Sequence, residues 1–151
     1  MKVLIVGSNE FLIKHVVNKY IKENYKVIRI SEENYGIDEN KKELKIYKKS
    51  LLSNDIKNIF RANKFHEVIY IPGDDELNES FKLKNILDLS VRYKVNKLTY
   101  ISSQEVYGQV SKEMDESKPV SPKSLLGSIK LECENILISY NDKINILIIR
   151  K

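Results

Sequence analysis

Short apolar runs alternate along this 151-residue chain with segments in which apolar side chains recur at helical spacing. The runs cover residues 2–6, 26–30, 44–47, 67–71, 97–102 and 145–149. Most of them are continuous rather than alternating, a pattern typical of strands that are buried on both faces of a parallel sheet. The alternation of such strands with helices predicts an α/β protein with a doubly wound parallel sheet of about six strands.

Four segments between these runs predict helices from the spacing of their apolar residues. The predicted inward-facing positions are Phe11, Leu12, Val16 and Tyr20 in the first helix, Ile56, Ile59 and Phe60 in the second, and Leu83, Ile86, Leu87 and Ser90 in the third. The last helix is predicted to begin near Ser124, and its apolar stripe comprises Leu126, Ile129, Cys133, Ile136, Leu137 and Tyr140. Residues 31–42 predict turns and a short helix. No repeat or linker interrupts the chain, so residues 1–151 predict a single domain.

The composition agrees with one globular domain. Hydrophobic residues make up 42% of the chain and charged residues 31%, which excludes a collagen-like or a polar disordered protein. The apolar runs are far shorter than the roughly 18 residues that cross a bilayer, so no membrane partner is expected. The one cysteine, Cys133, has no partner for an internal disulfide, and no signal-peptide pattern precedes the first run. We therefore expect a cytoplasmic protein.

The charged residues point to no nucleic acid and to no metal. The net charge of +5 arises from 26 basic and 21 acidic residues spread along the whole chain. Dispersed lysines without interleaved aromatic residues are typical of a solvated surface. His15 and His66 lie in different predicted elements, without a cysteine or carboxylate at metal-ligand spacing. The acidic run at residues 74–76 is more typical of a helix N-terminus than of a cation site.

The turn after the first strand carries the first candidate site. Residues 6–13 read VGSNEFLI, and the whole chain contains only five glycines. This turn and the motifs described below resemble the extended short-chain dehydrogenase/reductase family, the NAD-dependent sugar-nucleotide epimerases and dehydratases, whose first turn reads G-x-x-G-x-x-G. Those glycines let the backbone approach a pyrophosphate at a helix N-terminus. Here Gly7 keeps the first glycine, but Glu10 and Ile13 replace the second and third.

These replacements predict that NAD or NADP binding, implied by the resemblance, is weak or lost in this Rossmann-like domain. The Glu10 carboxylate would repel the phosphates, and Ile13 would push the helix from the strand unless it is simply a core contact. Ser31 and Ser50 stand where the family places acids for the adenosine, although Glu32 or Glu33 could substitute for the first of them. The positions that the resemblance assigns to the cofactor are Gly7, Ser8, Glu10, Phe11, Leu12, Ser31, Ser50 and Lys130.

Residues 99–108, TYISSQEVYG, resemble the fifth strand and the Ser-Ser/Thr-x-x-Val-Tyr-Gly signature of the same family. Residues 115–130 resemble the acidic, proline-containing loop that leads into its Tyr-Gly-x-Ser-Lys helix. The resemblance implies that Ser103 polarises the substrate oxygen and that Lys130 supplies the amine beside the catalytic tyrosine. The tyrosine itself is Leu126, which can neither donate nor accept a proton.

Three side chains near this constellation have competing interpretations. Glu105 aligns with the glutamate base of the dehydratases, or it is a loop carboxylate without a catalytic role. Tyr107 matches the tyrosine of the Val-Tyr-Gly turn and is predicted to be structural. Without its tyrosine, Lys130 is vestigial, either as a relic of the catalytic pair or as a lysine of the surface or dimer face.

The leading hypothesis is therefore a degenerate, catalytically inactive epimerase/dehydratase-like protein with a binding or assembly role. In the family a substrate-binding portion follows the sixth strand, and 151 residues hold almost none of it, so the C-terminal substrate domain is predicted to be absent. One alternative is an NAD(P)-dependent nucleotide-sugar enzyme or subunit in surface-polysaccharide synthesis, completed by another chain. Another is a sensor of a nucleotide or nucleotide sugar. The resemblance further implies a homodimer, or a heterodimer with an active homologue, through the third and last helices.

Overall fold

The computed structural model describes residues 1–33, 40–73, 77–108 and 115–151. The strands are β1 (Lys2–Gly7), β2 (Lys26–Ser31), β3 (Leu44–Lys48), β4 (Glu67–Ile71), β5 (Lys97–Ser102) and β6 (Asn145–Arg150). The helices are α1 (Glu10–Lys22), α2 (Ile56–Ala62), α3 (Glu79–Arg92) and α4 (Leu125–Ser139), and the short 3-10 helix η1 (Gln104–Tyr107) follows β5. All six strands are parallel, in the order β3-β2-β1-β4-β5-β6. The predicted doubly wound, Rossmann-like sheet is confirmed.

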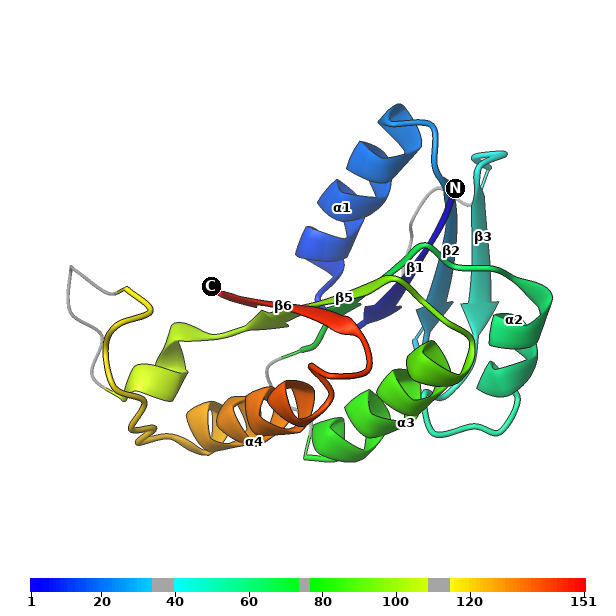
Figure 1. Ribbon diagram of the computed structural model, residues 1–151. Helices are drawn as coiled ribbons and strands as arrows, with labels where there is room; N and C mark the ends of the chain where they lie inside the picture. The colour runs from blue at the N-terminus through cyan, green and yellow to red at the C-terminus, as the bar shows by residue number, and fades with distance from the viewer. Residues whose placement is uncertain (34–39, 74–76, 109–114) are drawn as a thin grey trace.

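The sheet is covered unequally on its two faces (Figure 1). Helix α1 packs on one face, and α2, α3 and α4 pack together on the other. The larger core lies under these three helices and includes the fully buried Leu83, Ile86 and Leu87 of α3 and Cys133 of α4. Because apolar residues three or four apart share one face of a helix, this stripe could be predicted from the sequence. Ser90 completes it by donating its hydroxyl to the Ile86 carbonyl, 2.7 Å away.

The prediction for the inner face of α1 is wrong at Phe11. The side chains that enter the core are Ile13 and Val17, whereas Phe11 is 73% exposed and its ring lies 4.6 Å from that of His15. The reason is helix geometry: Phe11 lies two positions before Ile13, about 200° around the helix axis, so burial of the face with Ile13 and Val17 turns Phe11 towards solvent. The predicted role of Ile13 as a core contact is confirmed, since it is completely buried.

Two segments singled out in the sequence lie partly or wholly outside the described residues. Residues 34–39 of the segment predicted to hold turns and a short helix, and the acidic run at residues 74–76, lie outside the described residues. Within the described residues, no helix combines the length and apolarity that a membrane span requires.

Candidate functional site

The carboxyl ends of the parallel strands bring the predicted cofactor positions to one edge of the sheet. Gly7 ends β1 against the end of β4, where the Ser8 amide donates to the Ile71 carbonyl over 3.1 Å. Gly7 has φ +123°, and a Cβ atom on it would lie 1.8 Å from the Ile71 oxygen. A glycine is therefore required here by the contact between two strands, whether or not a ligand approaches the turn.

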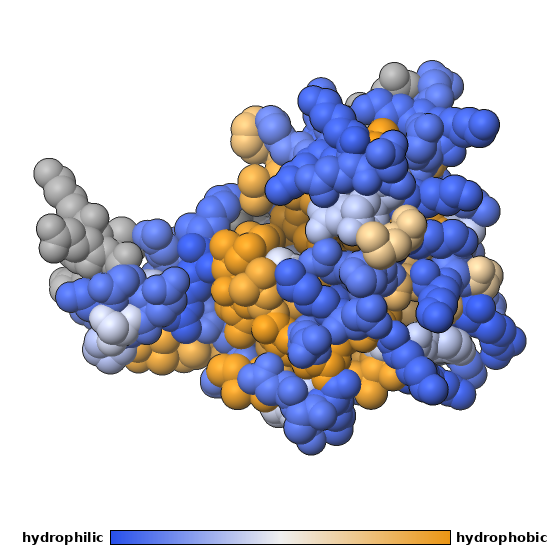
Figure 2. All heavy atoms as spheres, turned by 45° about the horizontal axis from the view of Figure 1, so that its top comes forward, coloured by the Kyte–Doolittle hydropathy of each residue, from blue (hydrophilic) through white to orange (hydrophobic). Residues whose placement is uncertain are grey.

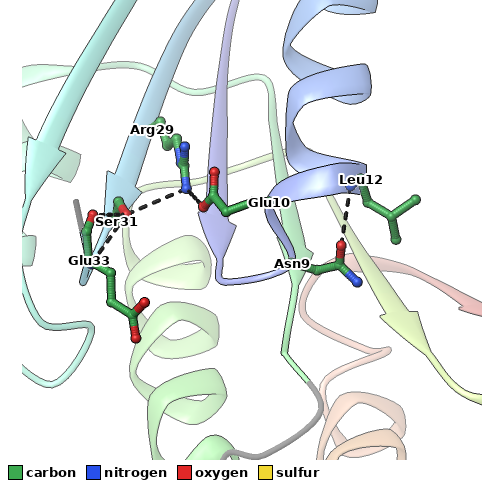
Figure 3. A network of polar contacts seen from close by, with 6 residues as sticks. All are labelled: Asn9, Glu10, Leu12, Arg29, Ser31 and Glu33. Atoms are coloured by element: carbon green, nitrogen blue, oxygen red, sulfur yellow. Dashed lines mark hydrogen bonds and ion pairs between the residues drawn. The ribbon is translucent and has the colours of Figure 1, made fainter. Parts of the chain in front are cut away.

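Polar side chains of the chain itself fill the turn between β1 and α1 (Figure 3). Asn9 Oδ1 accepts from the backbone N–H of Leu12 over 3.2 Å, so it occupies one of the donors at the helix N-terminus. Glu10 reaches from α1 to β2 and forms an ion pair with Nη2 of Arg29. The same Nη2 lies 3.4 Å from Ser31 Oγ, and Ser31 donates to the Glu33 carbonyl over 2.7 Å.

Arg29 is the residue of this site that the sequence analysis missed. It is only 1% exposed, although it carries a permanent positive charge. An arginine inside the otherwise apolar run VIRIS was the available signal, because a buried strand rarely contains an unpaired cation. The Glu10 carboxylate, which was expected to repel a cofactor phosphate, is thus neutralised by the guanidinium of Arg29.

The other predicted adenosine positions lie at or just after the ends of the paired strands β2 and β3 but in different environments. Ser31 is buried beside Arg29, whereas Ser50 is exposed and its hydroxyl accepts from the Leu52 amide over 3.2 Å. Glu32, one possible substitute for Ser31, pairs with Lys82 of α3 at 2.6 Å. Each of these side chains thus has a contact within the chain.

Lys130 is buried, which corrects its interpretation as a surface or dimer-face lysine. Its Nζ lies 3.0 Å and 3.2 Å from the two carboxylate oxygens of Glu79 and donates to the Gly73 carbonyl over 3.0 Å. The two side chains of this ion pair are 3% and 1% exposed. Tyr100 donates its hydroxyl to the same Glu79 carboxylate over 2.7 Å. The amine on α4 is therefore held by the first residue of α3.

This buried network suppresses the ionisation of its acidic members. Burial, followed by the charge of Glu79, raises the pKa of Tyr100 far above its ordinary value of 10.0. Burial likewise raises the pKa of the Cys133 thiol to about 12. Neither side chain can serve as a base or nucleophile near neutral pH.

Ser103 caps η1, and Glu105 contacts Ser124, the residue that caps α4. Ser103 precedes η1, and its Oγ accepts from the Glu105 amide over 3.2 Å. The Glu105 carboxylate accepts from the hydroxyl of Ser124, which in turn accepts from the Gly127 amide at the start of α4 over 3.0 Å. Leu126 is half-buried beside these caps. No proton-transfer group stands at the tyrosine position.

A small hollow is nevertheless lined by residues from two parts of the predicted site, the first turn and the catalytic motif. Its volume is about 40 Å³. It is lined by Asn9, Leu12, Pro72, Ile101, Ser102, Ser103, Lys130 and Lys151. The first turn, Ser103 and Lys130 therefore meet at the carboxyl ends of β1, β4 and β5, as the resemblance implies. Glu105 is not among the residues that line this hollow.

A larger hollow of about 450 Å³ lies along β6, beside η1 and α4. Its polar part is a network in which Arg150 pairs with Glu134 at 2.7 Å and donates to the hydroxyl of Tyr107 over 2.7 Å. Tyr107 is 8% exposed and thus has the structural environment predicted for it. Figure 2 shows apolar side chains gathered on this surface of the molecule, where Leu147 and Ile149 of β6 are 41% and 44% exposed.

The two histidines have contacts that do not involve a metal. His15 is exposed, and its Nδ1 lies 2.7 Å from the Phe11 carbonyl oxygen. His66 Nδ1 lies 3.0 Å from the Asn96 side-chain nitrogen. Among the described residues, no three His, Cys, Asp or Glu side chains form a group that could hold a metal ion.

Comparison with known proteins agrees with these motifs. The sequence model of the NAD dependent epimerase/dehydratase family matches residues 3–150. A dTDP-D-glucose 4,6-dehydratase of Homo sapiens is 25% identical over 92% of this chain and 46% of its own length, and one of Dictyostelium discoideum is 25% identical over 92% of this chain and 40% of its own. The chain thus spans about half the length of the curated relatives it matches.

Solved structures show the same fold. A UDP-glucose 4-epimerase of Thermotoga maritima, solved with UDP-glucose, matches with a TM-score of 0.85 and 22% identity, over 99% of this chain and 55% of its own. A UDP-glucuronic acid 4-epimerase of Bacillus cereus, solved with UDP-glucuronic acid and NAD, matches with a TM-score of 0.83 and 20% identity, over 99% and 56%.

Proposed function

Because the chain belongs to the NAD-dependent epimerase/dehydratase family, we propose that it is a member that does not carry out the family's redox chemistry by itself and acts through binding or assembly. The observation that carries this proposal is the state of the catalytic pair. Leu126 stands at the tyrosine position, and the Lys130 amine is bound by the buried carboxylate of Glu79 at 3.0 Å. At the tyrosine position, the Leu126 side chain offers neither a donor nor an acceptor for proton transfer with a substrate hydroxyl.

The residues of the first turn also do not fit a dinucleotide in the way the resemblance implies. A pyrophosphate needs free backbone N–H groups and positive potential at the helix N-terminus. Asn9 already occupies the Leu12 amide, and the Glu10 carboxylate lies at the turn as a bound anion of the chain itself. Weak or absent binding of NAD and NADP is therefore part of the proposal.

A thermal-shift panel with NAD, NADP, UDP-glucose and dTDP-glucose tests the proposal. A ligand at 100 times its dissociation constant would stabilise the fold by about 2.7 kcal/mol, which corresponds to roughly 5–10 °C in a domain of this size. We expect no such shift with NAD or NADP, while an active family member measured in parallel shows one. Reproducible conversion of a nucleotide sugar by this chain with bound NAD would refute the proposal.

Two other functions remain candidates. The hollow along β6 favours a subunit that pairs with another polypeptide, such as an active homologue. Turnover that appears only in the mixture of the two proteins would identify it. A sensor would give a thermal shift with a nucleotide sugar but no turnover. The hollow shared by Ser103 and Lys130, at about 40 Å³, has room for about one water molecule, so it would have to open to admit such a ligand.

A further inference from the structure

We propose that Arg29 forms an oxyanion site that the chain keeps filled with its own Glu10 carboxylate. This inference deepens the proposed function, because it explains why the first turn rejects a cofactor phosphate. Glu10 stands at the second glycine position of the phosphate turn, and its carboxylate pairs with Arg29 of β2 (Figure 3). The Glu10 carboxylate thus takes the place of a bound phosphate as the anion beside Arg29.

The burial of Arg29 is the first argument. Its side chain is 1% exposed, and a buried guanidinium charge requires an anion nearby. Glu10 is the carboxylate that the described residues place against it, and the other contact of Nη2 is the neutral hydroxyl of Ser31 at 3.4 Å. The Nε atom is buried without a hydrogen-bond partner among the described residues. The guanidinium therefore has spare donor capacity for an oxyanion.

The position of Glu10 is the second argument. Its side chain is 23% exposed, so the carboxylate fills the site from the solvent side, as a bound ion would. It belongs to the first turn of α1, where the helix dipole also favours a negative charge. Removal of the carboxylate would leave a positively charged recess that is open to small anions. A carboxylate or phosphate ion is the chemical class that fits it.

Chemical rescue of Glu10→Ala tests this assignment. The substitution removes the Cγ, Cδ and two oxygen atoms of the side chain, which are the heavy atoms of acetate. We expect the variant to unfold at a temperature roughly 5 °C or more below wild type. We further expect acetate or inorganic phosphate to restore part of this loss in a saturable manner, whereas chloride at equal ionic strength and neutral acetamide do not.

Two variants serve as controls. Glu32→Ala removes a carboxylate of similar exposure, 28% against 23%, but its partner Lys82 is 15% exposed, against 1% for Arg29, so its charge is less desolvated. We expect a smaller loss and no rescue by acetate. Glu10→Ala/Arg29→Met removes both charges, and we expect it to unfold closer to wild type than Glu10→Ala does, because a buried pair can be replaced by apolar atoms of similar volume.

The stabilities of these variants decide the assignment, that is, whether Arg29 forms an oxyanion site filled by Glu10. Equal stability of Glu10→Ala and Glu32→Ala, or equal rescue of Glu10→Ala and the double variant, would overturn it. If Glu10→Ala does not fold, folding of the double variant supports the assignment and its failure to fold contradicts it. No dinucleotide enters these measurements, so this assignment and the proposed function can fail separately.

Discussion

At the scale of single residues, the sequence identified the motif residues but neither their burial nor their partners. The motif around residue 130 identified Lys130 beside a missing tyrosine, but its interpretation as a surface or dimer-face lysine missed its burial. Its counter-ion, Glu79, lies 51 positions earlier in the chain, and no local pattern connects the two. Arg29, 19 positions from Glu10, was likewise not recognised as its partner. Ion pairs between elements depend on the tertiary structure, so the environment of a motif residue could not be predicted from the motif.

The buried network predicts a loss of stability at high pH. The pKa of Tyr100 and that of the Cys133 thiol are raised by burial, so the folded protein keeps protons that the unfolded chain releases near pH 10.0 and pH 9.0. The free energy of unfolding should therefore be insensitive to these groups near neutral pH and fall as the pH rises above about 9. Urea unfolding between about pH 7 and pH 10.5 measures this slope.

One variant isolates the contribution of Tyr100 to this slope. In Tyr100→Phe the phenol that titrates is gone, so the decline above pH 10.0 should become shallower, even if the variant is less stable at every pH. Tyr140→Phe should make the decline shallower in the same way, because a pKa raised to about 12 also keeps this phenol protonated in the folded protein up to about pH 10.5. An equal slope in Tyr100→Phe and wild type would show that Tyr100 does not ionise on unfolding in this range.

At the scale of elements, periodicity predicted which segments form strands and helices, but not their exact bounds or the helix face that is buried. The strand β2 extends to Ser31, one residue beyond the predicted run, and β6 extends to Arg150. In α1 the apolar residues at positions 11–13 and 16–17 allowed two overlapping faces. Packing against the sheet buries Ile13 and Val17, leaves Leu12 and Val16 half-buried and exposes Phe11.

The contact between α4 and η1 predicts an unusual response to alanine. Gly127 lies in the first turn of α4, where a Cβ atom would be 2.5 Å from the Glu105 carbonyl oxygen. Alanine normally stabilises a helix relative to glycine by about 1 kcal/mol. Here we expect Gly127→Ala to destabilise the protein by roughly 1–3 kcal/mol, because the backbone of η1 must move.

Ser128→Ala on the same helix is the control for this prediction. Ser128 is exposed, so its substitution should change the free energy of unfolding by less than about 0.5 kcal/mol. Urea unfolding of the two variants against wild type gives the comparison. A stabilising Gly127→Ala would mean that η1 does not press against α4 as closely as in this structure.

At the scale of the whole molecule, the alternation of strands and helices predicted a doubly wound sheet, but neither its strand order nor the surfaces used in assembly. The order β3-β2-β1-β4-β5-β6 obeys the right-handed crossover rule, but so do other doubly wound orders. Exposed apolar side chains among the described residues include Phe81 of α3 and Leu125 of α4, each 67% exposed, and Leu147 and Ile149 of β6. The family resemblance favours α3 and α4 as the assembly interface, whereas the hollow along β6 favours that strand as the interface.

Charge substitutions on the two surfaces separate these interfaces. The proposed homodimer pairs α3 and α4 with their copies, so Phe81→Lys should convert a dimer into a monomer by placing a charge in an apolar contact. Leu147→Lys introduces the same charge on β6 and should leave that dimer intact. Sedimentation at tens of micromolar measures both. A monomeric wild type would refute the homodimer, and dissociation by Leu147→Lys alone would place the interface at β6, because the exposed strand edge would then be the surface that a second copy covers.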